Sequence, residues 1–279
     1  MSKRVLVMLS EYGYWGEELL GPLEEFDKAG YTVDLMTTHG KRPQALPPSM
    51  DSEYIDPPLG RSVTSPEVAA KVRELDESTR LDNPLALADI IPEKPYRSAL
   101  TYLRDIEQHN NKLDDVAQNF VTKYDALLLV GGSGPIVDMA NNGRLHDLIL
   151  LFYKADKLIG AECYGVACLA FARDDDRKSI ISGKRVTGHC IEYDYKDGTG
   201  FMGTDFNMGP PPYPLEFILR DATQPGGAYI GNFGHEVSVI VDYPFVTGRS
   251  NHDSYPTGQK MVEVLDNGLR QWGFHPTGV

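Results

Sequence analysis

The sequence KLIGAECYGVACLA, residues 157–170, has the pattern of a short buried strand, a sharp turn at Cys163 and the first turns of an apolar helix. A side chain at such a corner projects above the sheet, and the unpaired N–H groups that open the helix point to the same place. The positive end of the helix dipole favours a thiolate there. We therefore interpret Cys163 as the cysteine of a nucleophile elbow. The alternative is a structural cysteine at a strand end, because free cysteines are among the most buried residues.

Strands and helices alternate on both sides of this elbow. Apolar runs bounded by turn residues predict strands at 4–10, 31–37, 124–130, 237–242 and 244–248. Apolar residues at helical spacing predict helices at about 17–29, 143–155 and 257–271, with shorter ones near 136 and at 215–219. This alternation predicts a doubly wound, mostly parallel α/β sheet that is flavodoxin-like in layout.

The pattern changes between residues 39 and 123. Prolines at positions 43, 47, 48, 57 and 58 break regular structure, and helical stretches follow near 66–75 and 96–119. This segment holds too few periodic apolar residues to build its own core. We therefore expect a single domain over residues 1–279 with an insertion or cap at about 39–123. Such a segment is either a lid over a site or only a long connection.

A glycine-rich turn, Gly131-Gly132-Ser133-Gly134-Pro135, joins the strand at 124–130 to a helix. Such a turn can hold a phosphate or supply N–H donors to an oxyanion. It lacks the Lys-Ser/Thr of a P-loop and the full G-x-G-x-x-G of a dinucleotide site, so we expect no nucleotide. The alternative is a tight turn that needs glycine for conformational reasons alone.

Composition and charge limit the classes of partner. The formal net charge is -13 and the pI about 4.9, whereas phosphate binding needs a basic surface, so we expect no nucleic acid partner. The first apolar run is too short for a signal peptide, and no stretch is long enough for a bilayer. Three cysteines without a secretion signal indicate the reducing cytoplasm. No Cys-x-x-Cys or His-x-x-x-His pair occurs, so we expect no metal and no cofactor.

Several short motifs occur in one order along the chain. They are Glu18 four residues before Pro22, the Gly131–Gly134 turn with Asp138 beyond it, the elbow at Cys163, Val186-Thr187-Gly188, Tyr213-Pro214-Leu215-Glu216, and Val241-Asp242 before Val246-Thr247-Gly248-Arg249-Ser250. This order resembles the ThiJ/PfpI superfamily within the class I glutamine amidotransferase-like fold, especially its larger branch of heat-shock chaperones, glyoxalases and deglycase-like proteins. The resemblance covers nearly the whole chain apart from much of the insertion. It also implies a homodimer with a role in the stress response.

The resemblance implies a site around the elbow. Cys163 is then the reactive nucleophile, Glu18 hydrogen-bonds it, and the N–H groups of Gly132 and Tyr164 form the oxyanion hole. The sequence also departs from the family at two positions. Tyr164 stands where most members of the larger branch have a histidine that acts as the base, and Ser133 replaces the usual histidine of the glycine loop.

A base must therefore come from another part of the chain. His189 follows the elbow helix and lies three residues before Glu192, which stands about where the resembled branch has the acidic member of its triad. His252 lies in another loop that the resemblance places near the pocket, and His235 has the pattern of a strand-edge histidine. For each histidine the alternative is an ordinary surface or hydrogen-bonded position. Glu18 has an alternative too, since an acid at a helix start favours the helix dipole; if it reaches Cys163, we expect it to be protonated.

These expectations favour a cysteine-dependent enzyme that acts on a small-molecule substrate. Cys163 would attack an electrophilic carbon in hydrolase, hydratase, or glyoxalase or deglycase-type chemistry, while two N–H groups hold the developing charge. The alternative is a non-enzymatic sensor of oxidative stress, or a chaperone, in which Cys163 is oxidised to the sulfinic acid. A third possibility is the glutaminase half of an amidotransferase, which needs a synthase partner.

Overall fold

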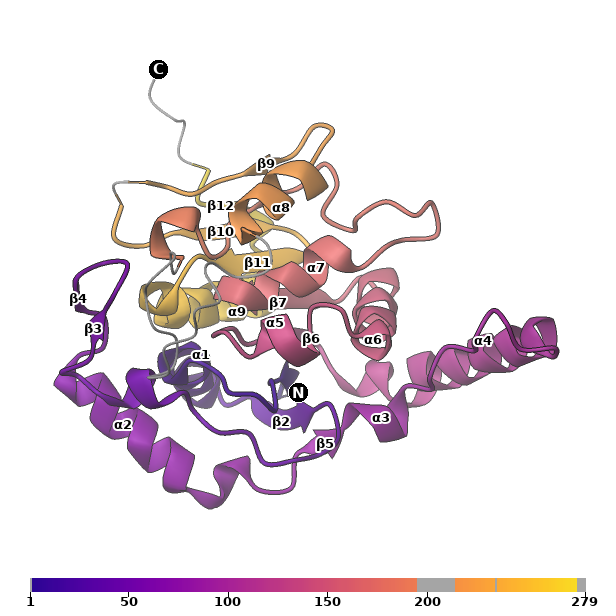
Figure 1. Ribbon diagram of the computed structural model, residues 1–279, viewed down its shortest axis with the longest axis horizontal. Helices are drawn as coiled ribbons and strands as arrows, with labels where there is room; N and C mark the ends of the chain where they lie inside the picture. Colours follow the sequence, from indigo (N-terminus) through magenta and orange to yellow (C-terminus); the bar gives the residue numbers. More distant parts are fainter. Residues whose placement is uncertain (1, 195–213, 234, 275–279) are drawn as a thin grey trace.

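Eight strands among the described residues form one central sheet (Figure 1). The structure is a computed structural model that describes residues 2–194, 214–233 and 235–274; Tyr213 of the sequence motif lies outside them. The strands of the sheet are β1 (Arg4–Met8), β2 (Thr32–Thr37), β5 (Leu85–Ala86), β6 (Ala126–Leu129), β7 (Leu158–Glu162), β10 (Val239–Asp242), β11 (Phe245–Gly248) and β12 (Gln271–Trp272). Their order across the sheet is β12-β10-β11-β7-β6-β1-β2-β5.

The sheet is mostly parallel, as the sequence predicted. The neighbours from β11 to β5 pair in parallel, and β10 and β12 add an antiparallel edge. The order β2-β1-β6-β7-β11 is that of a flavodoxin-like sheet. Every residue of β6 and β7 is buried, because helices cover both faces of these strands. The carboxyl ends of β1, β6 and β7 therefore open on one edge, where such sheets place their sites.

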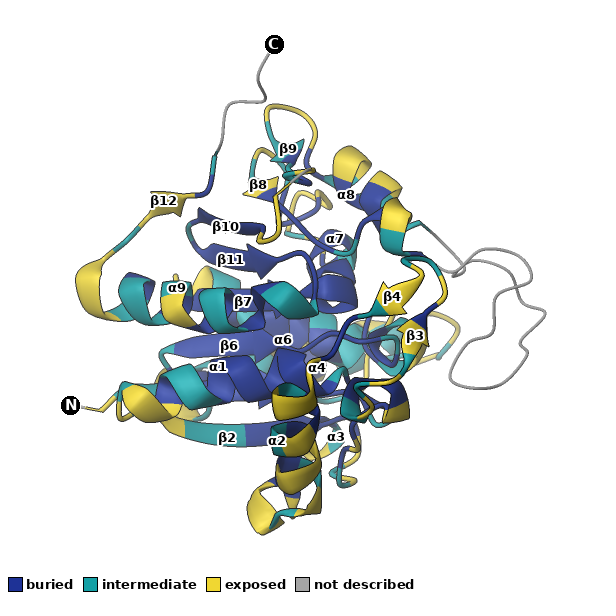
Figure 2. Ribbon diagram, turned by 90° about the vertical axis from the view of Figure 1, so that its left-hand side faces the viewer, coloured by how far each residue is buried: buried dark blue, intermediate teal, exposed yellow. Residues whose placement is uncertain are grey.

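Helices cover both faces of the sheet (Figure 2). One face packs against α1 (Gly16–Lys28) and α9 (Ser254–Asn267) through Leu19, Phe26 and Met261. The other packs against α6 (Gly143–Lys154) and α7 (Ala167–Phe171) through Phe152 and Leu169. The further helices are α2 (Pro66–Glu77), α3 (Leu87–Ile90), α4 (Tyr102–Asn119), α5 (Pro135–Asp138) and α8 (Leu215–Ala222).

Short elements connect these layers. The strands β3 (Ile55–Asp56) and β4 (Arg61–Ser62) form a small antiparallel pair, and β8 (Arg185–Val186) and β9 (Ala228–Tyr229) form a parallel one. The 3-10 helices are η1 (Pro47–Met50), η2 (Thr79–Leu81), η3 (Val121–Lys123), η4 (Cys163–Val166), η5 (Ile191–Tyr193) and η6 (Asn251–Asp253).

The edges of the sheet differ from the sequence prediction in two places. The last helix ends at Asn267, because Gly268 takes a left-handed φ of 70°, and the chain then forms the edge strand β12. At the opposite edge, β5 pairs in parallel with β2. Part of the segment expected as an insertion at 39–123 therefore belongs to the central sheet.

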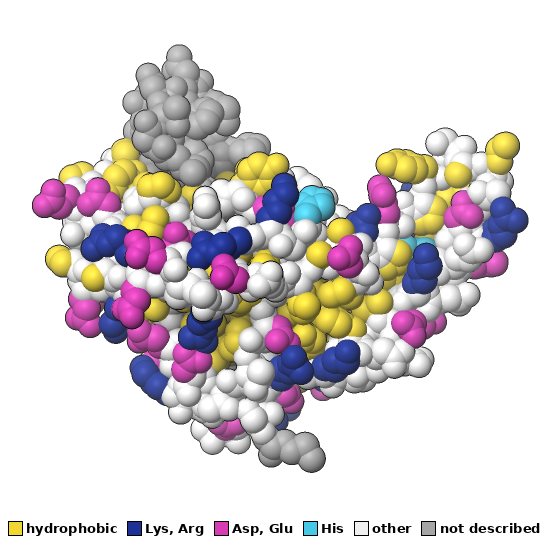
Figure 3. All heavy atoms as spheres, turned by 90° about the horizontal axis from the view of Figure 1, so that it is seen from below, with side chains coloured by type: hydrophobic (Ala, Val, Ile, Leu, Met, Phe, Trp, Pro, Cys, Tyr) yellow, Lys and Arg dark blue, Asp and Glu magenta, His cyan; other side chains and the backbone are white. Residues whose placement is uncertain are grey.

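The helix α4 extends away from the body of the molecule (Figure 1). Within this helix, which is described throughout, His109 and Val116 are the buried residues. Tyr96, Leu100 and Leu103, in and just before the start of this helix, are exposed. Figure 3 shows scattered hydrophobic side chains on the arm and a larger group where the arm meets the body. The arm thus adds little to the two cores that flank the sheet.

Candidate active site

Cys163 occupies the corner between β7 and η4, with a left-handed φ of 50°. Such a φ is strained for a residue with a Cβ, and this strain is typical of a nucleophile elbow. Neighbouring glycines make room for the turn. A Cβ on Gly131 would lie 2.8 Å from the Cys163 Cβ, and one on Gly165 would lie 2.5 Å from the Leu129 carbonyl oxygen. The sequence prediction of a sharp strand-to-helix corner at Cys163 is confirmed.

Two backbone N–H groups converge on the Cys163 sulfur. They belong to Gly132, in the glycine loop after β6, and to Tyr164, and both hydrogen bonds lower the pKa of the thiol. Gly132 has a φ of 86°, and a Cβ there would lie 2.4 Å from the Trp15 nitrogen. Only glycine fits this backbone without strain. The two donors expected from the sequence thus lie together at the sulfur.

His189 brings an imidazole to the thiol. Its Nδ1 lies 3.4 Å from the Cys163 sulfur, and its Nε2 lies 3.0 Å from Oδ1 of Asp194. The second contact is a close approach rather than an aligned hydrogen bond, because Nε2 has no hydrogen-bond partner among the described residues. A carboxylate beside Nε2 favours the tautomer with its proton there, which leaves Nδ1 able to accept the thiol proton.

Tyr164 contacts the same carboxylate oxygen. Its phenol donates a hydrogen bond to Oδ1 of Asp194, and its ring stacks on the His189 ring with centroids 4.2 Å apart. Tyr193 presents an edge to His189 at 6.1 Å. The imidazole is therefore fixed by an aromatic face, an aromatic edge and a buried carboxylate.

Glu18, in the first turn of α1, lies behind the thiol and hydrogen-bonds Cys163. Burial, with a smaller effect from the charge of Glu17, raises the pKa of Glu18 to about 8. Its Oε2 has no hydrogen-bond partner among the described residues. The hydrogen bond itself lowers the pKa of Glu18 and raises that of the Cys163 thiol, so the thiol donates to the carboxyl oxygen. Burial outweighs this contact, and a carboxyl with a pKa of about 8 carries a proton at neutral pH, as expected from the sequence.

The resting thiol differs from the sequence prediction in its pKa. The elbow was expected to favour a thiolate, but burial, followed by the charge of Glu18, raises the pKa of Cys163 well above its usual value. The helix dipole is weak here because α7, which follows η4, has five residues. Burial therefore opposes a resting thiolate, and a base beside the thiol would assist its ionisation.

No contact with the Cys163 thiol is found for the other predicted residues among those that the structure describes. Glu192 is exposed on η5, and Asp194, two residues later, contacts His189 instead. His252 lies in η6, where burial, followed by the charge of Arg61, lowers its pKa. No contact between His252 and Cys163 occurs in the described part of the chain. Ser133 lies in the glycine loop, and its hydroxyl is buried without a hydrogen-bond partner there.

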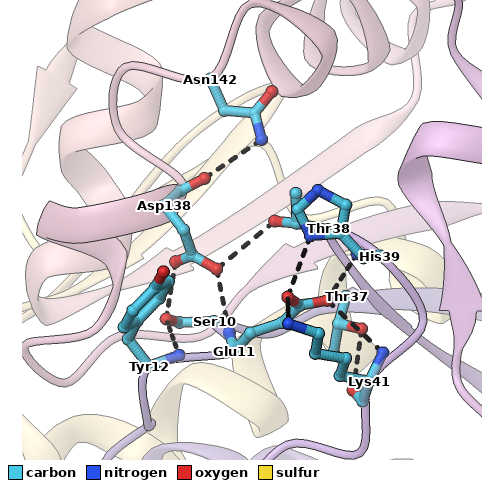
Figure 4. A network of polar contacts seen from close by, with 9 residues as sticks. All are labelled: Ser10, Glu11, Tyr12, Thr37, Thr38, His39, Lys41, Asp138 and Asn142. Carbon is cyan, nitrogen blue, oxygen red and sulfur yellow. Dashed lines mark hydrogen bonds and ion pairs between the residues drawn. The ribbon is translucent and has the colours of Figure 1, made fainter.

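Asp138 fixes the loops around the site (Figure 4). Its carboxylate accepts hydrogen bonds from the Ser10 hydroxyl at 2.6 Å, the Glu11 N–H at 2.9 Å and the Thr38 hydroxyl at 3.3 Å. These residues follow β1 and β2, whereas Asp138 ends the short helix α5 after the glycine loop. The network therefore ties three loops into one unit.

Two further features, a metal-binding cluster and a membrane-spanning helix, are absent from the residues that the structure describes. No group of three or more His, Cys, Asp or Glu side chains there is arranged to hold a metal ion. None of the described helices is long and apolar enough to cross a membrane.

A cysteine elbow at the carboxyl edge of a flavodoxin-like sheet defines the class I glutamine amidotransferase-like architecture. Within this class, residues 9–181 match the family described as ThiJ/PfpI family-like, and the chain belongs to that family. The resemblance inferred from the sequence motifs is thereby confirmed.

Individual relatives are distant. Over 140 residues, the chain is 29% identical to glutamine amidotransferase-like class 1 domain-containing protein 1 of Bos taurus, in a match that covers 50% of this chain. The chain spans 59% of that relative's length. It is 23% identical over 248 residues to protein/nucleic acid deglycase HchA of Pseudomonas aeruginosa (strain LESB58), covering 89% of this chain and 71% of the relative.

Solved structures share the fold. The rapid encystment protein of Francisella tularensis has a TM-score of 0.64 at 20% identity, with 94% of this chain and 99% of that chain covered. Glyoxalase III of Candida albicans has a TM-score of 0.54 at 17% identity, with coverages of 95% and 98%. These similarities extend over nearly the whole of each chain.

Proposed function

We propose that the protein is a cysteine-dependent enzyme for small electrophilic carbonyl compounds, with Cys163 as nucleophile and His189 as base. The observation that carries this proposal is the line of contacts from the Cys163 sulfur to His189 Nδ1 at 3.4 Å and from His189 Nε2 to Asp194 at 3.0 Å. The same order of nucleophile, imidazole and carboxylate activates nucleophiles in unrelated folds.

The chemistry follows from these positions. His189 Nδ1 takes the thiol proton as the Cys163 sulfur bonds to the carbonyl carbon. The electron pair of the carbonyl moves to its oxygen, and the N–H groups of Gly132 and Tyr164 hold the resulting oxyanion. Asp194 stabilises the imidazolium. With an aldehyde, His189 returns its proton to the oxyanion and gives a hemithioacetal. With an ester or amide, the oxyanion collapses to a thioester as the bond to the leaving group breaks, and His189 protonates that group. Water, deprotonated by His189, then hydrolyses the thioester and releases the Cys163 thiol.

The family suggests the kind of substrate. Relatives and structural neighbours are named as a deglycase and a glyoxalase. We therefore place 2-oxoaldehydes and their adducts first among the substrates, and activated esters and amides second. One relative is named for action on protein and nucleic acid, so the absence of a nucleic acid partner remains a prediction. The homodimer is also a prediction.

The sensor alternative requires a thiolate in the resting protein, because the thiolate is the form that peroxide oxidises. Burial raises the pKa of Cys163, which works against that route. An imidazole in contact with the sulfur favours base-assisted attack on a bound substrate instead.

The test is a turnover screen. 2-Oxoaldehydes, activated esters and amides are offered to the wild type and to Cys163→Ser, His189→Asn and Cys168→Ser. We expect Cys163→Ser and His189→Asn to lose turnover, and Cys168→Ser, in the neighbouring helix α7, to keep it. Full turnover in Cys163→Ser would contradict the proposal. Intact mass after mild peroxide tests the sensor, since a stable gain of two oxygens that depends on Cys163, without any turnover, would favour it.

A further inference from the structure

His189, the proposed base, belongs to no helix or strand, because it lies between β8 and η5. Its own N–H donates to the Cys163 carbonyl oxygen at 3.5 Å, which is long for a hydrogen bond. Proton transfer from the thiol still needs the imidazole within hydrogen-bond reach of the sulfur. The segment that carries His189 must therefore be held by other parts of the chain.

A carboxylate of α8 holds the segment after His189. The Ile191 N–H donates to Oε2 of Glu216 at 3.1 Å, and Glu216 is buried. The other oxygen, Oε1, accepts hydrogen bonds from Nε and Nη2 of Arg220 at 2.9 and 2.7 Å. Arg220 lies one turn further along α8, so the carboxylate is fixed by its own helix while it bonds the segment. Glu216 ends the sequence motif at 213–216, to which the proposed reaction gives no role.

A phenol of β9 holds the segment before His189. The Tyr229 hydroxyl donates to the Gly188 carbonyl oxygen at 3.0 Å. The Arg220 guanidinium lies over the Tyr229 ring, with its central carbon 5.1 Å from the ring centroid. The same arginine therefore contacts both groups that hold the segment, the Glu216 carboxylate and the Tyr229 ring.

Close packing at Gly188 brings the segment within reach of α8. A Cβ on Gly188 would lie 2.8 Å from Cδ1 of Leu219, in α8, and 3.2 Å from Cβ of Val166, in η4. A side chain there would push against both helices, so glycine lets the chain pass this close to them. The residue before His189 is thus packed against α8 and against the helical turn that begins at Cys163.

We propose that Glu216 and Tyr229 are positioning residues that keep His189 within reach of the Cys163 thiol. They bond the backbone on either side of His189, and neither contacts the thiol in the described structure. A displacement of about 1 Å at a reacting group can slow a reaction by roughly 100-fold, so a looser segment should slow the removal of the thiol proton. This inference rests on the proposed role of His189 as the base.

The experiment measures alkylation by iodoacetamide at neutral pH, read at Cys163 by fragment-ion mass spectrometry, with each change made in the wild type and in His189→Asn. We expect Glu216→Ala to slow alkylation roughly tenfold in the wild type and less than about twofold beside His189→Asn, because both changes act through one imidazole. Glu216→Gln should recover part of the rate, since its amide oxygen can still accept the Ile191 N–H. Asp221→Asn, at an exposed acid of α8, is the matched control and should follow the wild type.

The outcomes separate the two proposals. A loss of the same size in both backgrounds would show that Glu216 acts without His189, and would overturn this inference alone. Equal alkylation of wild type and His189→Asn would overturn the role of His189 as the base.

Tyr229→Phe is the second variant if Glu216→Ala does not fold. It keeps the ring beside Arg220 and removes the hydroxyl that holds Gly188. Alkylation should slow by roughly threefold in the wild-type background and stay unchanged beside His189→Asn. A wild-type rate in Tyr229→Phe would contradict its positioning role.

Discussion

Tyr164 and His189 stack ring on ring, 4.2 Å apart, and both contact the same carboxylate oxygen of Asp194. Tyr164 stands directly after the elbow cysteine, whereas His189 comes from a separate segment after α7. The imidazole that contacts the thiol thus comes from outside the elbow. Tyr164, inside the elbow, stacks on this imidazole and hydrogen-bonds Asp194. This arrangement explains how an elbow without an adjacent histidine can retain a base.

Tyr164→Phe removes the phenol that holds Asp194 and keeps the stacked ring. We expect a stability loss of about 1–2 kcal/mol, since a charge-assisted hydrogen bond is lost. Asp194 is then fixed by fewer contacts, so alkylation of Cys163 at neutral pH should slow by roughly tenfold, about 1.4 kcal/mol. Thermal unfolding and the alkylation rate measure the two effects. Tyr12→Phe, at an exposed tyrosine, is the control and should change neither.

Asp194→Asn tests which acid serves His189. An amide cannot stabilise an imidazolium as a carboxylate does, so turnover should fall by roughly 100-fold or more. Glu192→Gln, two residues earlier and exposed, should retain turnover within about twofold. A larger loss in Glu192→Gln than in Asp194→Asn would show that the structure assigns the wrong acid.

The buried carboxyls predict that stability falls as pH rises. The pKa of Glu18 is about 8 in the folded protein, against about 4.3 in an unfolded chain. The folded state therefore binds more protons between these values, so its stability is full below about pH 4 and declines up to about pH 8. Glu18→Gln should flatten this slope and gain on wild type, between about pH 4 and pH 8, by on the order of 4 kcal/mol of unfolding free energy. Urea unfolding at three pH values measures it, and parallel slopes would contradict this assignment.

Asp138→Ala removes the acceptor of three hydrogen bonds that connect the loops after β1 and β2 to α5. We expect a loss of about 2–3 kcal/mol in unfolding free energy, because buried donors lose their partner. Alkylation of Cys163 should slow as well, since the glycine loop before α5 carries the Gly132 N–H. Asp176→Ala, at an exposed turn, serves as the control. Normal stability in Asp138→Ala would mean that the network is dispensable.

Gly132→Ala places a Cβ 2.4 Å from the Trp15 nitrogen at a φ of 86°. Strain and steric overlap should cost about 2–4 kcal/mol and displace the N–H that faces the Cys163 sulfur. Gly143→Ala is a matched control, because no atom lies within 4 Å of a Cβ built there. Thermal unfolding and turnover are measured for both variants. A loss in Gly132→Ala but not in Gly143→Ala would assign the effect to strain at Gly132, and equal losses would contradict this assignment.

The sequence predicted the parts of the fold with a strong hydrophobic pattern. The runs of β1, β6 and β7 and the periodic helices α1, α6 and α9 lie within a few residues of their predicted positions. The edge strands β5 and β12 have two residues each, which is too short to show an alternation. Pairing with a neighbouring strand, rather than local preference, creates them.

The site was less predictable because its members come from irregular segments. The sequence analysis proposed Cys163 and His189, which lie 3.4 Å apart in the structure. It favoured Glu192, whereas Asp194 is the acid that contacts His189. Glu192 lies in η5, a 3-10 helix of three residues, and Asp194 directly follows it. A segment this short has no hydrophobic periodicity from which to predict which of the two acids is buried. The burial of Glu162 was not predicted either, because an acid at a strand end is usually solvated. Its neighbour in β11 is Gly248, which is 86 residues further along the chain.

The stability of the arm formed by α4 is only weakly coupled to the stability of the central sheet. A helix that buries two of its side chains gains little from tertiary packing, so its amides should open without unfolding of the sheet. Hydrogen exchange would then be fast along the outer turns of the helix and slow in β6 and β7. The arm can accordingly unfold, change its sequence or bind another surface while the cysteine and its base keep their geometry.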